Sequence, residues 1–274
     1  MSAIDSAGAT TTSARAPARE WHTVREASRA TLHLGAREVR LVLRTPGLWI
    51  PNLITPLLFF FVIVGSLSEL AAQSGVENYA AFQLPFVLLF SAQGGSAGLN
   101  MVNDIESGYF DKLLLTPASR LAILIGAMGA DFIRIVVQGL IVAIVALATG
   151  MDFATGILGL LVMVVLASLW GLAFSAMGFA IALKTGNPQA TQNTWLMVFP
   201  LLFLTTGFAP LERLSGWLAT AARFNPITYL LRGLRSLSVT GWDAGEIGVA
   251  LLAIAGLGAI TLTLAFRALL GRVR

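Results

Sequence analysis

Four charged side chains gather within nine positions of an otherwise apolar chain, and they are the first candidates for chemistry. They lie in the stretch NDIESGYFDKLLLTPASR, residues 103–120, between two long uncharged stretches. The four are Asp104, Glu106, Asp111 and Lys112. Such a group can bind a soluble partner or only keep a connecting loop hydrated, and the charges alone leave both open.

The pattern within this stretch predicts a short amphipathic helix. Carboxylates precede the apolar triplet 113–115, and a helix stabilises negative charge in its first turn. We expect Leu113 and Leu114 to cover the buried face while the neighbouring charges stay at the surface. Thr116 and Pro117 then end the element before the next apolar stretch.

A serine in the sequence GGSAG, residues 94–98, is the second candidate because it matches the nucleophile pattern G-x-S-x-G. Ser96 would need a general base, yet both histidines, His22 and His33, precede it in the N-terminal segment. Small residues in a row are better explained as a helix face that packs closely, since glycine lets backbones approach. We predict no catalytic residue and regard an intramembrane protease as the least favoured hypothesis.

Nucleotide and metal sites are not predicted for this chain. A phosphate-binding P-loop needs Gly-Lys followed by Ser or Thr, whereas Lys112 follows Asp and Lys184 follows Leu. With no cysteine and two histidines, a metal site has almost no ligands to draw on.

Asp131 and Arg134 are the only charged residues between positions 121 and 151. Ionisable groups in a membrane helix are usually paired, near its end, or functional. Three positions apart on one helix, the two can pair with each other, and we interpret them as a structural ion pair. A proton or ion relay, or contact with a partner protein, remains an alternative.

The elements that must position these residues are membrane helices. The chain is 56% hydrophobic and 12% charged, with a mean hydropathy of +0.79, far more apolar than a soluble domain. A helix needs about 20 apolar residues to cross a bilayer. We therefore predict an all-α membrane protein with six transmembrane helices, within 45–68, 78–103, 121–150, 153–183, 185–211 and 247–266.

Basic residues set the expected orientation. The two short loops 69–77 and 151–154 carry no basic residue and are predicted to lie outside, which puts residues 103–120 and both termini in the cytoplasm. The segment 212–246 departs from this rule because it falls outside yet contains four arginines. We interpret it as short helices on or dipping into the outer face of the membrane.

The N-terminal segment changes character at about residue 20. Residues 1–20 are rich in Ala, Ser and Thr and are predicted to be a disordered cytoplasmic tail. Residues 21–45 carry a basic stripe at helical spacing, which predicts an amphipathic helix on the inner membrane surface, although a solvated helix face is the plainer alternative. The stripe includes Arg25, Arg29, Arg37 and Arg40.

Prolines predict breaks between the elements. Gly186-Asn187-Pro188 should form a tight turn with Pro188 at a helix start, and Asn225-Pro226 should divide the outer segment into two pieces. Pro200 predicts a kink near an aromatic group made of Phe199, Phe203 and Phe208.

The order of these motifs closely resembles that of ABC type-2 transporter permeases, and most of all the bacterial multidrug and antibiotic-resistance branch typified by daunorubicin export permeases. The resemblance rests on DIESGYFDKLLLTPASR at 104–120, ILIG at 123–126, Gly-Asn-Pro at 186–188, FPLLFLTTGFAPLERL at 199–214 and NPITY at 225–229 followed by RGLR at 232–235.

The resemblance implies a six-span domain over residues 46–270, with 271–274 as a cytoplasmic tail, in the bacterial plasma membrane. The permease would form a homodimer or a dimer with a related permease. It would bind two copies of a separate ATPase, and that ATPase would bind ATP and Mg. The permease would also contact the lipid bilayer, and no nucleic acid partner is expected. By carry-over, the stretch 104–120 contains the coupling helix that docks on the ATPase. Its residues would be Glu106, Gly108, Asp111, Leu113, Leu114, Thr116 and Pro117.

The same resemblance makes residues 21–45 the connecting helix and the region 210–229 the outer helices. Export of hydrophobic or amphipathic molecules is the implied activity, and the aromatic group at 199–208 is either a lining of the path or ordinary packing. A secondary transporter is the main alternative, followed by an assembly subunit.

Overall fold

The computed structural model describes residues 46–272 except for positions 74, 77, 94–96 and 116–119. Its regular secondary structure is helical throughout these residues, as predicted. The predicted N-terminal tail and basic helix, residues 1–45, lie outside them. The helices are α2 (Pro46–Gln73), α3 (Tyr79–Ala92), α4 (Ala97–Glu106), α5 (Tyr109–Leu114), α6 (Arg120–Leu147), α7 (Gly156–Thr185), α8 (Pro188–Gln192), α9 (Thr194–Phe203), η1 (Leu211–Arg213), α10 (Gly216–Phe224), α11 (Pro226–Arg235), the π-helix η2 (Ser236–Thr240) and α12 (Ala244–Arg272).

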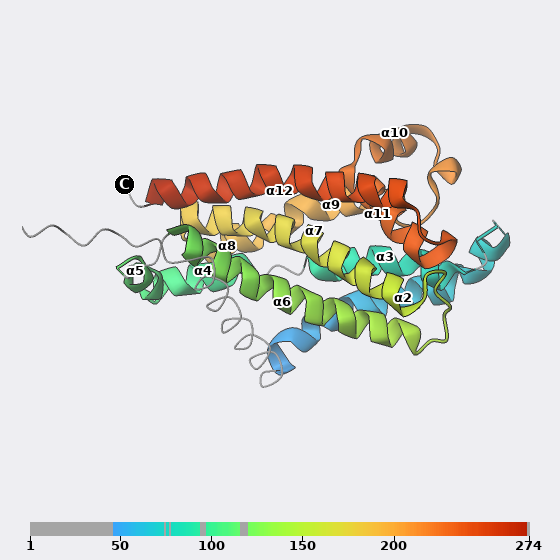
Figure 1. Ribbon diagram of the computed structural model, residues 1–274, viewed down its shortest axis with the longest axis horizontal. Helices are drawn as coiled ribbons and strands as arrows, with labels where there is room; N and C mark the ends of the chain where they lie inside the picture. Colours follow the sequence, from blue (N-terminus) through green and yellow to red (C-terminus); the bar gives the residue numbers. More distant parts are fainter. Residues whose placement is uncertain (1–45, 74, 77, 94–96, 116–119, 273–274) are drawn as a thin grey trace, which may run out of the picture.

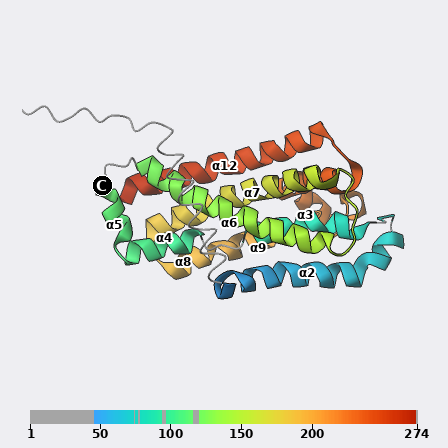
Figure 2. The same ribbon diagram turned by 60° about the horizontal axis from the view of Figure 1, so that its bottom comes forward.

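Among the described residues, four helices are long and apolar enough to cross a membrane. They are the segments Leu53–Gln73 of α2, Ile123–Leu147 of α6, Gly156–Thr185 of α7 and Ala244–Arg272 of α12. Figures 1 and 2 show these helices running roughly along the long axis, with α7 in the interior and α2 at one edge. Helix α7 packs against α12, α6, α4 and α3, which explains why its buried residues are distributed around the helix.

The other two predicted spans are interrupted in the structure. In place of one span over 78–103, α3 has 14 residues and α4 has 10 residues. In place of one span over 185–211, α8 has 5 residues and α9 has 10 residues, joined at Asn193, whose backbone N–H closes α8 on the Gln189 carbonyl. Hydropathy detects apolar length but not such breaks, which occur at sequences with poor helix propensity.

Two Asn-Pro turns form as predicted. Gly186 takes the left-handed conformation after α7, and Asn187 Oδ1 then accepts hydrogen bonds from the N–H groups of Gln189 and Ala190 to cap α8. Asn225 ends α10 and caps α11 through the N–H of Ile227. Pro200 lies inside α9, which ends three residues later at Phe203.

The two ends of the bundle contain different elements. Helix α5 lies at one end of the long axis, and α11, η2 and the start of α12 lie at the other (Figure 1). We call these the α5 end and the α11 end. A large apolar core extends from α2, α3 and α7 to α11, whereas a smaller core joins α4, α5, α6, α7 and α12 toward the α5 end.

Candidate functional site

The charged stretch forms a helix–turn–helix unit at the α5 end. Helix α4 continues to Glu106, the chain turns at Gly108 with a φ of 70°, and α5 starts at Tyr109. This φ lies in the left-handed region that favours glycine, and the Gly108 N–H bonds to the Ile105 carbonyl at 3.0 Å. Gly108 therefore ends one helix and lets the next begin at once.

One detail of the predicted helix is wrong. Asp104 and Glu106 lie in the last turn of α4, so of the predicted carboxylates only Asp111 lies in the first turn of α5. Met101 and Val102 on α4 are buried in the smaller core, and α4 continues through Asp104 and Glu106 before the turn at Gly108.

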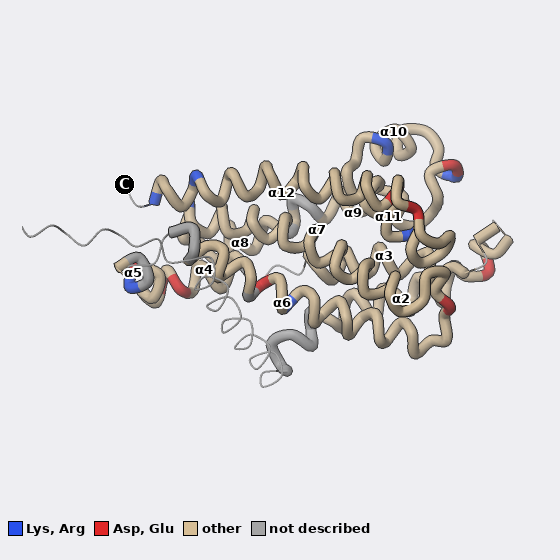
Figure 3. Tube along the Cα trace, in the orientation of Figure 1, with Lys and Arg blue, Asp and Glu red and all other residues tan. Residues whose placement is uncertain are grey.

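Three of the four charges of this unit are exposed to solvent, and Asp104 is half-buried. Glu106, Asp111 and Lys112 are exposed, and Figure 3 marks charged segments of both signs at α4 and α5. Two apolar side chains are exposed beside them, Tyr109 at 45% and Leu115 at 87%. Thr116 and Pro117, and the side chains of Leu113 and Leu114, fall outside what the structure describes.

A buried phenylalanine, which the sequence reasoning missed, fixes α5 to the bundle. Phe110 is 1% exposed and packs in the smaller core with residues of α4, α6, α7 and α12, among them Val102, Phe179 and Leu269. Its signal in the sequence is the spacing to Leu113 and Leu114, which lie three and four positions later on one helix face. Phe110 therefore connects α5 to the smaller core, to which α4, α6, α7 and α12 also contribute.

Helix α4 is itself held tightly against α7. A Cβ atom on Gly98 would lie 2.9 Å from the carbonyl oxygen of Gly178 on α7 and would clash with Thr191 on α8. The close-packing interpretation of the small residues is thus correct at Gly98. Ser96 lies outside the described residues.

Asp131 and Arg134 form an ion pair on one face of α6. Nε and Nη2 of Arg134 both donate to Asp131 Oδ1, at 2.9 and 2.5 Å. The carboxylate is buried and the guanidinium nearly so, with side-chain exposures of 4% and 12%. Pairing within one helical turn offsets much of the cost of burying either charge.

The predicted aromatic group belongs to a larger aromatic cluster. Phe199 and Phe203 have ring centroids 4.7 Å apart, and Phe203 lies 5.6 Å from Phe208. Rings from α2 and α3 complete the cluster, with Phe86 5.2 Å from Phe208 and Phe59 5.6 Å from Phe90. Such geometries stabilise packing between α2, α3 and α9.

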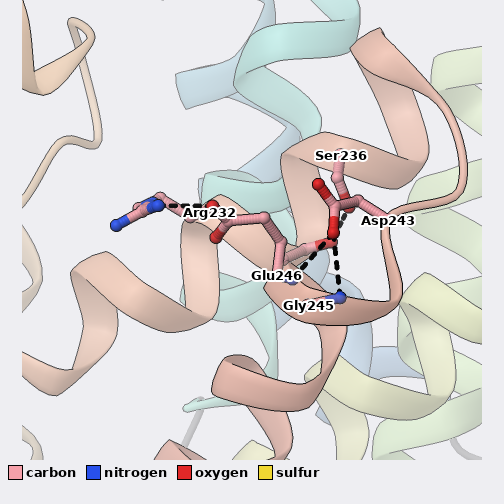
Figure 4. Close-up of polar contacts among 6 residues, drawn as sticks. Arg232, Ser236, Asp243, Gly245 and Glu246 are labelled. Atoms are coloured by element: carbon pink, nitrogen blue, oxygen red, sulfur yellow. Dashed lines mark hydrogen bonds and ion pairs between the residues drawn. The ribbon is translucent and has the colours of Figure 1, made fainter.

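A buried arginine at the α11 end is the second feature that the sequence reasoning missed. Arg235 is 9% exposed and donates hydrogen bonds to the carbonyl oxygens of Phe82 and Gly207 and to the Thr206 hydroxyl. Burial lowers its pKa to about 9, so the group remains a cation at neutral pH. Arg232, one turn earlier, is exposed and forms an ion pair with Glu246 (Figure 4). Nothing in the arginine pattern itself separates the two environments.

Comparison with known proteins decides the family. A family profile described as ABC-2 type transporter matches residues 29–238, more than half of the chain. The chain belongs to the ABC-2 type transporter family. It is therefore a multi-pass permease subunit, which lacks an ATPase domain, and the family implies a separate ATPase partner. This result confirms the resemblance and the expectation of no enzymatic activity, and it decides against the secondary transporter, the assembly subunit and the protease.

The curated relatives include drug-resistance permeases and putative transport permeases. The permease is 26% identical over 218 residues to the daunorubicin resistance ABC transporter permease protein DrrB1 of Streptomyces coeruleorubidus, covering 78% of this chain and 75% of that protein. It is 24% identical over 191 residues to the probable doxorubicin resistance ABC transporter permease protein DrrC of Mycobacterium tuberculosis, covering 69% of each. It is 29% identical over 211 residues to the putative transport permease ycf38 of Cyanophora paradoxa, covering 73% of this chain and 71% of that protein.

Proposed function

We propose that this permease is the membrane subunit of an exporter that moves hydrophobic or amphipathic molecules out of a bacterial cell. A drug, a lipid and a glycolipid all fit this class. Two of the relatives are named for resistance to anthracycline drugs, which supports export as the direction of transport. Hydrolysis of ATP, bound together with Mg by the separate ATPase, supplies the energy. Two copies of that ATPase bind a permease dimer.

The observation that carries the proposal is the α4–α5 unit. Exposed charges at Glu106, Asp111 and Lys112, together with exposed Tyr109, offer a mixed polar and apolar surface to a soluble partner. Buried Phe110 connects that surface to the smaller core. We assign the unit the coupling role, with Gly108 as its turn and with Leu113, Leu114, Thr116 and Pro117 included by family resemblance.

The proposed topology places the α5 end and both termini in the cytoplasm. Helices α3 with α4, and α8 with α9, would complete two further crossings beside the four long helices and so give six spans. Residues 21–45, with Arg25, Arg29, Arg37 and Arg40, would form the connecting helix beside the ATPase on the inner membrane surface.

The mechanism follows from the connection through Phe110. Closure of the ATPase pair on ATP would push α5, and the motion would pass to α4, α6, α7 and α12 because all four contact the smaller core. Movement of these helices would open a route between two protomers. The aromatic cluster with Phe199, Phe203 and Phe208 is our proposed contact for the transported molecule, since aromatic rings accept varied apolar ligands.

The test is ATP-driven transport by the permease together with its ATPase. The permease is co-expressed with the ATPase from a neighbouring reading frame that contains G-x-x-x-x-G-K-[ST], and uptake of daunorubicin into inside-out vesicles is measured. We expect co-purification and uptake that needs hydrolysable ATP. Uptake driven by a proton gradient without the ATPase would refute the proposal, and a panel of lipids and drugs would define the substrate.

A further inference from the structure

One guanidinium joins three segments of the permease at the α11 end. Arg235 is the last residue of α11, and its Nε donates to the Phe82 carbonyl of α3 at 3.1 Å. Nη1 donates to Thr206 Oγ1 at 3.2 Å and Nη2 to the Gly207 carbonyl at 2.9 Å, both in the segment after α9. The guanidinium carbon also lies 3.6 Å from the centroid of the Phe82 ring. Helices α3 and α11 and the segment after α9 therefore meet at a single side chain.

The partners of Arg235 are all neutral. Within the part of the chain that the structure describes, no carboxylate pairs with this guanidinium, whereas Arg232 in the same helix pairs with Glu246. Breaking a buried ion pair leaves two uncompensated charges, but a carbonyl or hydroxyl acceptor can exchange the arginine for water. This set of contacts is suited to opening and closing.

Irregular backbone bounds α11 on both sides. The extended Asn225 precedes α11, and the π-helix η2 follows Arg235 and ends at Gly241, where φ is 119°. π-Helical turns are rare in proteins, and those that occur are often found at functional sites. Carbonyls of η2 accept hydrogen bonds from the neighbouring α6–α7 loop, from the Thr155 hydroxyl to Leu237 at 2.6 Å and from the Ala154 N–H to Ser238 at 3.3 Å.

The same contacts lie directly against the aromatic cluster. A Cβ atom on Gly207, which accepts from Arg235, would lie 2.5 Å from the ring of Phe86. The next residue, Phe208, packs on Phe86, and its carbonyl accepts from the Tyr79 hydroxyl at 3.2 Å. Separation of Arg235 from Gly207 would therefore loosen the cover of the aromatic cluster at this end.

We propose that Arg235 is a latch that positions α11 against α3 and the segment 206–207, and that its contacts open in each transport cycle to uncover the aromatic cluster. The role in transport rests on the proposed export function, whereas the latch contact itself does not. Arg235 acts through α11 and Gly207 and is a positioning residue.

The first experiment uses cysteine labelling, because the chain has no cysteine of its own. Ser238→Cys reports on η2 beside the latch, and Ser168→Cys reports on the middle of α7; both serines are 1% exposed. Each is placed in lipid nanodiscs, where reagent reaches both membrane faces, and the rate of maleimide labelling is measured. In the Arg235→Gln background we expect about tenfold or faster labelling at position 238 and no change at 168, because three charge-assisted hydrogen bonds are lost.

Arg232→Gln is the matched control, one turn away in the same helix, and it should change neither rate. An unchanged rate at 238 in Arg235→Gln, or an equal rise at 168 that indicates general loosening, would overturn the latch. If Arg235→Gln does not accumulate, Arg235→Lys replaces it, since lysine keeps the charge but cannot reach all three acceptors. The same rise at 238 is then expected, and its absence again overturns the proposal.

The second experiment adds the partner ATPase. With Arg235 intact, labelling at 238 should rise when ATP and vanadate trap the ATPase, and with Arg235→Gln it should be fast with or without nucleotide. With Arg235 intact, labelling at 238 that does not respond to nucleotide in a preparation that exports daunorubicin would overturn the latch while leaving the proposed function in place. A preparation that exports nothing with ATP contradicts the proposed function instead, and the labelling in nanodiscs then decides by itself whether the latch contact holds.

Discussion

The two ends of the permease treat their polar groups in opposite ways. At the α5 end, Glu106, Asp111 and Lys112 are exposed, and Phe110 is buried among the neighbouring helices. At the α11 end, Arg235 and Asn225 turn inward and bond to backbone carbonyls of neighbouring segments. Among the described residues, the first end exposes charged groups to another molecule, while Arg235 and Asn225 at the second end hold its own segments together.

The same dipeptide shows this contrast most directly. Asn187-Pro188 at the α5 end and Asn225-Pro226 at the α11 end both cap a short helix. Asn187 is exposed, whereas Asn225 is 5% exposed. Only Asn225 also donates from Nδ2 to the carbonyls of Leu201 and Leu204, at 2.6 and 2.9 Å. An identical local signal thus acts as a cap alone in one place and as a link between elements in the other.

The largest effect on stability is expected at Phe110, the buried aromatic residue of α5. Phe110→Ala removes a fully buried ring and should lower the free energy of unfolding by about 3 to 5 kcal/mol. Tyr109→Ala, the adjacent exposed position, should change it by less than about 0.5 kcal/mol. Denaturation in mixed micelles measures both, and equal effects would mean that α5 is not anchored through Phe110.

Substitution of the two Asn-Pro asparagines should give intermediate losses of unfolding free energy that differ between the two ends. Asn225→Ala removes a cap and two further hydrogen bonds and should cost about 2 to 3 kcal/mol, whereas Asn187→Ala removes only a cap and should cost about 1 kcal/mol. The same denaturation assay compares them. A larger cost for Asn187→Ala would reverse the distinction between the two ends.

The smallest effect belongs to the exposed ion pair of the α11 end. Arg232→Gln should cost less than about 1 kcal/mol, because the Arg232 and Glu246 side chains are 48% and 27% exposed. In about 1 M salt, which screens such pairs, the difference from the parent permease should vanish. A cost that is large and independent of salt would show that this pair, and not only Arg235, holds the α11 end.

Much of the fold was predictable because it depends on local rules. Apolar length predicted the four long helices, and the Asn-Pro pairs predicted the helix start at Pro188 and the break at Asn225-Pro226. The predicted second and fifth spans are interrupted, since hydropathy sums over residues 78–103 and 185–211 without registering where a helix breaks.

The sequence predicted the exposed charges of the candidate site but not the buried side chains that hold its elements in place. Family resemblance located the α4–α5 unit, and the surface charges of α5 are exposed as expected. Phe110 and Arg235 were missed because their roles depend on side chains brought from distant helices, 153 residues apart in the case of Arg235 and Phe82. The sequence alone does not distinguish the buried arginine of the segment 212–246 from the exposed ones, because burial depends on which distant residues surround each side chain.

The central claim is that the α5 end is the surface through which ATP hydrolysis drives export, and one charge reversal tests it. A partner surface that complements the Glu106 carboxylate should be basic, so Glu106→Arg places a positive charge against positive charge. Glu212→Arg makes the same change at an exposed residue of η1 and serves as the control. The measurement is ATP-driven daunorubicin uptake into inside-out vesicles that contain the permease and its ATPase. We predict that Glu106→Arg lowers uptake about tenfold or more with unfolding free energy unchanged within about 0.5 kcal/mol, and that Glu212→Arg leaves uptake intact. Wild-type uptake by Glu106→Arg would contradict the account.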